Sequence, residues 1–414
     1  MLSFFTRSDD MHPFFHRAIR LAFLNLVLTA LIALYAQGIP LFGWSGGYAQ
    51  VQYIALQFFM TGWIFTILFA SILGSFPVVD SKSLLAYRSV FVLAQIGSYG
   101  MLCSHLLDEM DIMLSLFALV FTVATTWFSL RVIRDTYGDS TLSRRFLVLC
   151  LIFLFLSSSA PYVLAWLDGT MINERFVQNA TYFFFHIGYN GWITFGIAAL
   201  VIRYLEMRGW APEGRAGRRY FRWMAYSSLF TFFLHTLWGE ANPFNYVLAG
   251  FGALLQIGAS VYLMHSLSLR NRQKDPGVPL IARRLFLMAG IAFLLKIALQ
   301  MASAFPRVAE MAYRDHPMVH AFLIEILVGF VSFFFIAWAM RKEWMLVTPW
   351  LRLGVWLFVA GFFAFEIILA IEGIQFAKIK TSPAWFQGVL FISTSFMVLG
   401  TSSLAFSKLR ASLD

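Results

Sequence analysis

A histidine and an asparagine lie one helical turn apart in Phe183–Trp192, an apolar stretch that reads FFFHIGYNGW. His186 and Asn190 are separated by four residues, so a helix would place both side chains on one face. A second stretch, Leu234–Pro243, reads LHTLWGEANP and sets His235 in the next predicted helix. Imidazole is a good ligand for iron or copper, so the two histidines would begin a metal site if their helices met. Alternatively, each histidine could simply bond to a neighbouring helix or lie at an interface.

Ionisable residues also interrupt the apolar runs in the second half of the chain: Lys296, His320, Glu325, Glu366 and Glu372. Such groups are costly in an apolar medium, and they commonly mark proton paths or buried pairs. Lys296 and Glu325 could form a buried ion pair that holds two helices together, or they could transfer protons. Glu366 could carry a proton or bond to a neighbour. His320 could lie at an interface, and Glu372 could be solvated.

The composition is that of a membrane protein. Of the 414 residues, 60% are hydrophobic and 13% are charged, and the mean hydropathy is +0.73. An average soluble domain is about a quarter charged. The sequence lacks the alternating strands of about ten residues that build an outer-membrane barrel. The two cysteines, Cys103 and Cys150, lie in apolar runs and are expected to pack in the core, without forming a disulfide framework or a CxxC site.

Repeated apolar runs of roughly 20 residues predict an all-α polytopic membrane protein with twelve transmembrane helices. The breaks between the runs are short and carry Gly, Pro, Asp or charge clusters. We therefore expect one domain over residues 1–414, with a short cytoplasmic segment at 1–20 and a cytoplasmic tail at 407–414. No convincing repeat relates the two halves of the sequence. The predicted spans are 21–42, 51–74, 85–105, 112–132, 146–166, 177–202, 222–239, 244–267, 284–304, 318–340, 352–373 and 384–406.

The distribution of basic residues predicts the orientation of these helices. Of the 31 Lys and Arg residues, 25 belong to the ends and loops that would be cytoplasmic if both termini are inside, and 5 belong to the opposite loops. Such an excess is typical of cytoplasmic loops, so it predicts an N-in, C-in topology. It also accounts for the net charge of +10 through contact with anionic lipid, without a nucleic-acid partner. The predicted topology places most of the ionisable residues of the apolar runs in the outer half of the membrane, with Lys296 near the middle.

Two stretches resemble the catalytic subunit of haem–copper oxidases and its nitric oxide reductase branch. HIGYNGW is similar to the sixth span of that branch, with His186 at the metal-ligand position, Gly191 at the glycine, and Asn190 where the reductases have glutamate. LHTLWGEANPFNYVLAGFGALL is similar to the seventh span, with His235 as the second histidine of a pair and Leu234 in place of the first.

A third stretch, FLLKIALQ, looks like the eighth-span lysine segment of the proton-conducting oxidases, although Lys296 falls in the ninth predicted span. The haem ligands match less well. In the family the tenth span carries two histidines ahead of a glycine, but the positions counted back from Gly329 hold Phe322 and Ile324, and His320 lies two residues earlier. The second span carries a haem-ligand histidine in the family and none here; its nearest polar candidate is Gln57.

The resemblance implies a twelve-helix bundle with approximate threefold arcs, in the inner membrane of a bacterium and beside other respiratory-complex subunits. It implies a divergent subunit with an incomplete haem set, in which iron or copper is possible. Lys296 and Glu325 would then be remnants of a proton path or a structural pair. The candidate residues are Asn190, Lys296 and Glu325 for catalysis, His320 for haem binding, and His186 and His235 for a metal ion.

Two other functions also agree with the sequence. The first is a haem- and copper-containing membrane protein of the NnrS type, which acts in nitric oxide metabolism and whose opening would resemble the MHPFFHRA stretch. The second is a secondary transporter, which twelve spans and buried lysine and glutamate residues would suit. No inverted repeat with paired broken helices supports a transporter in the sequence. Bound haem would separate these functions, because it gives a visible spectrum and a transporter gives none.

Overall fold

The computed structural model describes residues 13–76, 81–106, 111–160, 162–163, 174–237, 242–268, 277–314, 316–379 and 385–407. Throughout these residues the regular structure is helical, which confirms the all-α prediction. The helices are α1 (Pro13–Phe42), α2 (Tyr48–Phe58), η2 (Phe59–Ile64), α3 (Phe65–Leu73), α4 (Ser81–Leu106), α5 (Asp111–Asp135), α6 (Leu142–Ser158), α8 (Glu174–His186), η3 (Ile187–Ile193), α9 (Thr194–Met207), α10 (Gly214–Phe230), η4 (Thr231–Thr236), α11 (Pro243–Ser268), α12 (Leu280–Ser303), α13 (Pro306–Arg314), α14 (His316–Ile324), η5 (Glu325–Ser332), α15 (Phe333–Arg341), α16 (Pro349–Ile379) and α17 (Trp385–Ala405).

The protein is a multi-pass helical membrane protein. Within the described residues, nine helical segments are long and apolar enough to cross a membrane. Each of the twelve predicted spans coincides with a helical segment, but three of these segments are not among the nine. These three are α4, α6, and α10 together with η4. Helix α6 has only 17 residues, and α10 starts with a basic sequence. Twelve membrane crossings and the orientation of the helices therefore stay predictions.

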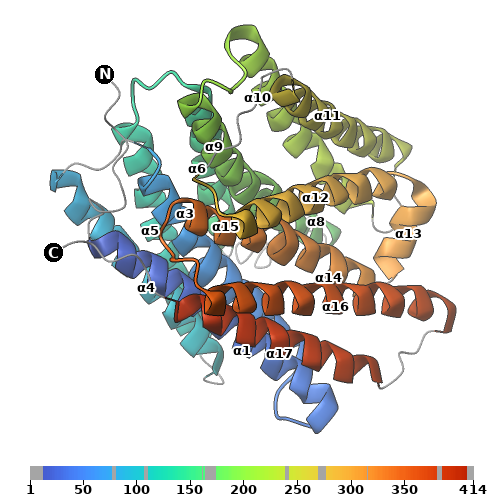
Figure 1. Cartoon of the computed structure of the whole chain (residues 1–414). Helices are drawn as coiled ribbons and strands as arrows, with labels where there is room; N and C mark the ends of the chain where they lie inside the picture. Colours follow the sequence, from blue (N-terminus) through green and yellow to red (C-terminus); the bar gives the residue numbers. More distant parts are fainter. Residues whose placement is uncertain are drawn as a thin grey trace.

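Three helical rods form the interior of the bundle. They are α2–η2–α3, α8–η3–α9 and α14–η5–α15, and 78%, 83% and 67% of their most apolar stretches are buried. For the other six candidate spans the buried share is at most 50%. The three inner rods coincide with the second, sixth and tenth predicted spans, so burial recurs every fourth span. The first and last helices, α1 and α17, pack against each other and close the bundle (Figure 1).

Each inner rod contains a π-helical segment with a similar sequence. The sequences are Gly-Trp-Ile at 62–64, Gly-Trp-Ile at 191–193 and Gly-Phe-Val at 329–331. The glycines allow close packing: a Cβ atom on Gly191 would lie 2.7 Å from the Phe153 ring. The repeat therefore divides the chain into thirds, which is why a comparison of its halves does not reveal it.

Polar side chains satisfy carbonyl groups in these π-helical segments. A π turn widens the helix and disturbs the regular hydrogen-bond ladder. The Thr194 hydroxyl donates to the Tyr189 carbonyl at 2.7 Å, and the Ser332 hydroxyl donates to the Leu327 carbonyl at 3.0 Å. Ser332 also accepts a 3.2 Å hydrogen bond from Trp63 Nε1, so η2 and η5 are in direct contact. The first two bonds stabilise the π turns within their own rods, and the Trp63–Ser332 bond joins two rods at the level of these turns.

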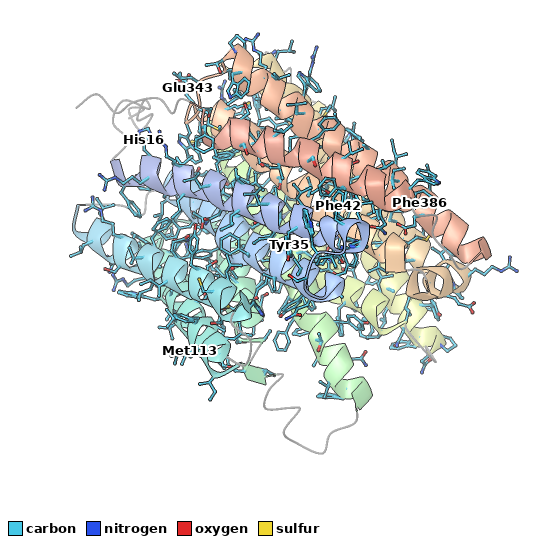
Figure 2. The ribbon with its side chains drawn as sticks, turned by 90° about the horizontal axis from the view of Figure 1, so that it is seen from below. His16, Tyr35, Phe42, Met113, Glu343 and Phe386 are labelled. Carbon is cyan, nitrogen blue, oxygen red and sulfur yellow. The ribbon has the colours of Figure 1, made fainter. Side chains whose placement is uncertain are left out.

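The outer surface of the bundle is apolar. Large hydrophobic side chains are exposed on the outer helices, and Figure 2 shows Tyr35 and Phe42 on α1 and Met113 on α5. An apolar surface of this extent is unsuited to water and is typical of contact with other apolar matter. At one end of α1, Phe42 packs edge-to-face on Phe391 of α17, with ring centroids 5.1 Å apart. The protein thus presents an apolar face to the lipid bilayer.

Candidate functional site

His186 is held by protein groups at both ring nitrogens. It is the last residue of α8, immediately before the π turn, and it is completely buried. Its Nε2 lies 2.7 Å from the Ser228 carbonyl oxygen, which can only accept, so Nε2 carries the proton. Nδ1 then accepts a 3.1 Å hydrogen bond from the Asn190 amide. A metal ion could bind either nitrogen only by displacing one of these partners.

The hydrogen-bonded chain continues from Asn190 to another helix. Asn190 is buried in η3, and its Oδ1 lies 3.5 Å from Nε2 of Gln300 on α12. Gln300 was not singled out in the sequence, although it lies four residues after Lys296 in the FLLKIALQ stretch. A helix places these two residues on one face, so that spacing was a usable signal. The sequence could not have identified the Ser228 carbonyl as a partner of His186, because every residue carries a backbone carbonyl.

Lys296 and Glu325 are both buried, and no described residue forms a hydrogen bond with either side chain. Lys296 is fully buried, and Glu325 is 4% exposed at the first position of η5. Among the described residues, neither the Lys296 side-chain nitrogen nor either Glu325 carboxyl oxygen has a hydrogen-bond partner. The Lys296 nitrogen lies 5.4 Å from the centroid of the Phe293 ring, within cation–π range.

The contact ion pair expected between Lys296 and Glu325 is not formed. Among the described residues the ion pairs with N–O separations up to 4.0 Å involve other side chains. The two groups interact only at longer range, across the contact between α12 and η5. The sequence gives the depth of each residue along its helix, but the rotation of the helix about its axis decides whether the side chains meet.

Glu366 extends this group of ionisable residues to a third helix. It lies on α16, and one of its carboxylate oxygens is buried without a hydrogen-bond partner. Helix α16 packs against η5, the segment that carries Glu325. We refer to Lys296, Glu325 and Glu366 as the open cluster. An unpaired charge in an apolar interior costs several kcal/mol, so these groups must be neutral or hydrated, and their protonation can change.

The structure brings together the two segments that carry the predicted metal ligands. His235 lies in η4, which packs against α8, and Thr231 Oγ1 of η4 is 3.5 Å from His186 Nε2. The side chain of His235 falls outside the described residues, so a metal site there stays a prediction. Within the part that the structure describes, no three His, Cys, Asp or Glu side chains are grouped to hold a metal ion.

The described residues do not fit a haem. His320, the candidate axial ligand, is half-buried on α14 and packs edge-to-face on Phe365, with ring centroids 6.0 Å apart. Gln57, the polar candidate in the second span, bonds to His105 of α4. The Trp63–Ser332 hydrogen bond joins the second and tenth predicted spans directly at one level. Within the described residues of these two spans His320 is the single histidine, so an axial pair is missing there and no chemical step is assigned to haem.

Comparison with known protein families and with curated proteins finds no match for this chain. The buried side chains themselves are therefore the basis for a functional proposal.

Proposed function

We propose that this protein is a proton-relaying membrane protein with the helix layout of the haem–copper oxidase and nitric oxide reductase catalytic subunit, without the haem set of that family. It would act in or beside a respiratory redox system in a bacterial inner membrane. The observation that carries the proposal is the burial of Lys296 and Glu325 on adjacent helices, with no hydrogen-bond partner and no contact ion pair in the part of the chain that the structure describes. Ionisable groups of this kind inside membranes commonly mark proton relays.

The arrangement of the inner rods supports the resemblance to that layout. The most buried rods are the second, sixth and tenth segments, and each carries a π turn with a glycine and an aromatic residue. Threefold arcs of four helices would produce this recurrence. The open cluster lies on the tenth segment and its neighbours α12 and α16.

A proton could pass from Glu325 to Lys296, which would turn two neutral side chains into a transient carboxylate and ammonium whose combined charge is zero. The O–H bond of the neutral Glu325 carboxylic acid breaks, and the proton joins the nitrogen lone pair of neutral Lys296. Since the two groups are more than 4.0 Å apart, a side-chain rotation or a water molecule must bridge them. Glu366 would supply the next proton to Glu325, since its helix α16 packs against η5. Gln300 lies one helical turn after Lys296 on α12. Its amide hydrogen-bonds to Asn190, which in turn bonds to His186.

Proton flux into vesicles tests this proposal. The purified protein would be reconstituted with an internal pH dye, and a potassium gradient with valinomycin would set the membrane potential. We expect Lys296→Met and Glu325→Gln each to lower the flux about 100-fold. Glu213→Gln is the matched control, because Glu213 is exposed before α10 and should leave the flux unchanged. Wild-type flux no greater than that of empty vesicles would overturn the proposal. Flux only with an added solute would instead indicate a transporter.

A metal-dependent function is the second candidate, and the packing of η4 beside His186 favours it. His186 and His235 would hold iron or copper, as a partial site of the oxidase or NnrS type. The test is a reduced-minus-oxidised visible spectrum with iron and copper counted in the same sample. Stoichiometric metal that is lost in His186→Ala would support this candidate. Wild-type protein that contains no metal and still conducts protons would exclude it.

A further inference from the structure

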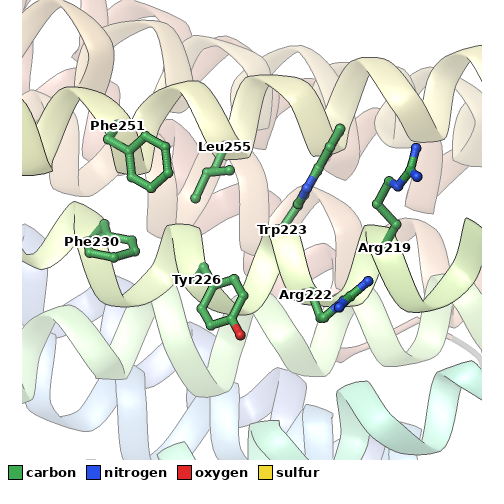
Figure 3. A pocket seen from close by; sticks show the side chains of 7 residues that line it. All are labelled: Arg219, Arg222, Trp223, Tyr226, Phe230, Phe251 and Leu255. Carbon is green, nitrogen blue, oxygen red and sulfur yellow. The ribbon is translucent and has the colours of Figure 1, made fainter.

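A half-open groove of about 280 Å³ lies between α10 and α11, away from the open cluster. Figure 3 shows that its lining changes in character from one end to the other. Arg219 and Arg222 lie at one end, and Phe230 and Phe251 face each other at the opposite end. The volume is close to the lower limit of small-molecule pockets, about 300 Å³. The groove therefore has a cationic end and an apolar end.

The packing of the two helices explains why the groove closes at its apolar end. A Cβ atom on Gly252 of α11 would lie 2.6 Å from the Thr231 backbone nitrogen, so the helices are in backbone contact there. Next to this contact, Phe230 packs edge-to-face on Phe251, with ring centroids 5.3 Å apart. Toward the arginines the helices are separated by side chains, including the large ring of Trp223. The apolar end is thus a fixed floor, and the other end is open.

The two arginines of the groove are available to a ligand. Arg219 and Arg222 are exposed, and within the described residues neither is in an ion pair. They are three residues apart on α10, so both lie on one face of the helix. Guanidinium groups bind phosphate through paired hydrogen bonds. This end of the groove is therefore complementary to a phosphate monoanion or diester.

We propose that the groove binds an anionic phospholipid. The phosphate group would contact Arg219 and Arg222, and part of one acyl chain would follow Tyr226 and Leu255 toward Phe230. From Arg219 to Phe230 the helix rises about 16 Å, which suits the upper part of an extended chain. The predicted topology places the arginines at the cytoplasmic surface, where anionic lipids concentrate. This site does not depend on the proposed proton relay.

Lipid titration of the full-length protein in detergent tests the site. Native mass spectrometry would count bound palmitoyl-oleoyl phosphatidylglycerol, and phosphatidylcholine with the same chains would be the uncharged comparison. We expect Arg219→Gln/Arg222→Gln to weaken phosphatidylglycerol binding about tenfold. The matched control is Arg215→Gln/Arg218→Gln, which removes the same charge from exposed positions of α10 outside the groove. The control should change binding less than about twofold.

Several results would overturn the proposal. Equal losses in both double variants would mean a general surface charge effect, and equal binding of the two lipids would exclude phosphate recognition. Inorganic phosphate that binds alone and displaces the lipid would identify a soluble anion as the ligand. If the first variant does not fold, Leu255→Trp fills the apolar end while keeping both arginines. It should then weaken phosphatidylglycerol binding about tenfold, and unchanged binding would count against the site.

Discussion

Two groups of buried polar residues lie in the same apolar bundle, and they differ in whether their hydrogen bonds are satisfied. Around η2, Asn25 donates to the Gly62 carbonyl at 2.8 Å and to Gln95 at 3.1 Å. Gln95 donates to Thr66 at 2.9 Å, and the Tyr99 hydroxyl donates to Asn25. We call these residues the closed network. Around η5, the open cluster has buried polar atoms without partners on all three of its residues.

The contrast separates structural polar residues from residues that can change charge. A fully connected network in a low-dielectric interior stiffens the structure, and it consists here of neutral groups. The open cluster consists of ionisable groups, which gain nothing from hydrogen bonds in this structure. Burial by itself therefore does not distinguish the two groups. Connectivity does, and it predicts opposite effects of removing the polar atoms.

The largest effect is expected from Asn25→Leu in the closed network. The change removes three hydrogen bonds and leaves the Gly62 carbonyl and Gln95 without Asn25, so the free energy of unfolding should fall about 3 kcal/mol. Unfolding by SDS titration in mixed micelles would measure it. Thr29→Val is the control, because its hydroxyl bonds only to the Asn25 carbonyl of its own helix. If Asn25→Leu lowers the free energy of unfolding no more than Thr29→Val does, the closed network is not more important for stability than an ordinary hydrogen bond within one helix.

The opposite sign is expected for the double variant Lys296→Met/Glu325→Gln. Replacing unpaired buried ionisable groups by neutral side chains of similar size is often stabilising, and we expect a gain of about 2 kcal/mol. The same SDS titration applies, and Lys296→Met alone should also not destabilise the protein. A loss of 2 kcal/mol or more in the double variant would show that the two groups support each other, and the cluster would then be structural.

A smaller loss of stability is expected for His186→Phe. This variant tests whether His186 has a structural role through its hydrogen bonds, like the residues of the closed network. The ring nitrogens bond to the Ser228 carbonyl and to Asn190, so losing them should lower the free energy of unfolding about 1 kcal/mol. A chelator added to the wild-type protein should leave its stability unchanged. Stabilisation of the wild type by iron or copper, absent in the variant, would instead support a metal ligand.

The smallest effect is expected at Lys342, a lysine beyond the end of α15 that does have a partner. Its ammonium group donates to the Gly74 carbonyl at 2.9 Å. Burial, with nearby Arg341 and Arg203, lowers its pKa to about 8. Above this pKa the unfolded chain holds more protons, so stability should rise from pH 8 toward 10, by less than about 1 kcal/mol per unit. The stability of Lys342→Met, measured at the same pH values, should not show this rise. An identical pH dependence of stability in the wild type and the variant would contradict the lowered pKa of Lys342.

Helix positions could be predicted from the sequence because apolar run length determines which segments cross a membrane. A buried ion pair between Lys296 and Glu325 was one of two alternatives for these residues; α12 does pack against η5, but the contact ion pair is not formed. The π turns were not predicted, since neither run length nor composition reports a widened turn. Only the alignment of the three inner rods makes the repeat at Gly62, Gly191 and Gly329 visible.

Sequence alone determined that this chain is helical, that it is apolar enough for a multi-pass membrane protein, and that a few ionisable groups lie inside its apolar runs. These properties follow from composition and from the order of residues along each helix. The tertiary structure decided which polar groups meet: His186 is bonded on both sides, whereas Lys296 and Glu325 stay apart. The reason is that such contacts depend on the rotation and packing of neighbouring helices, which no single apolar run encodes.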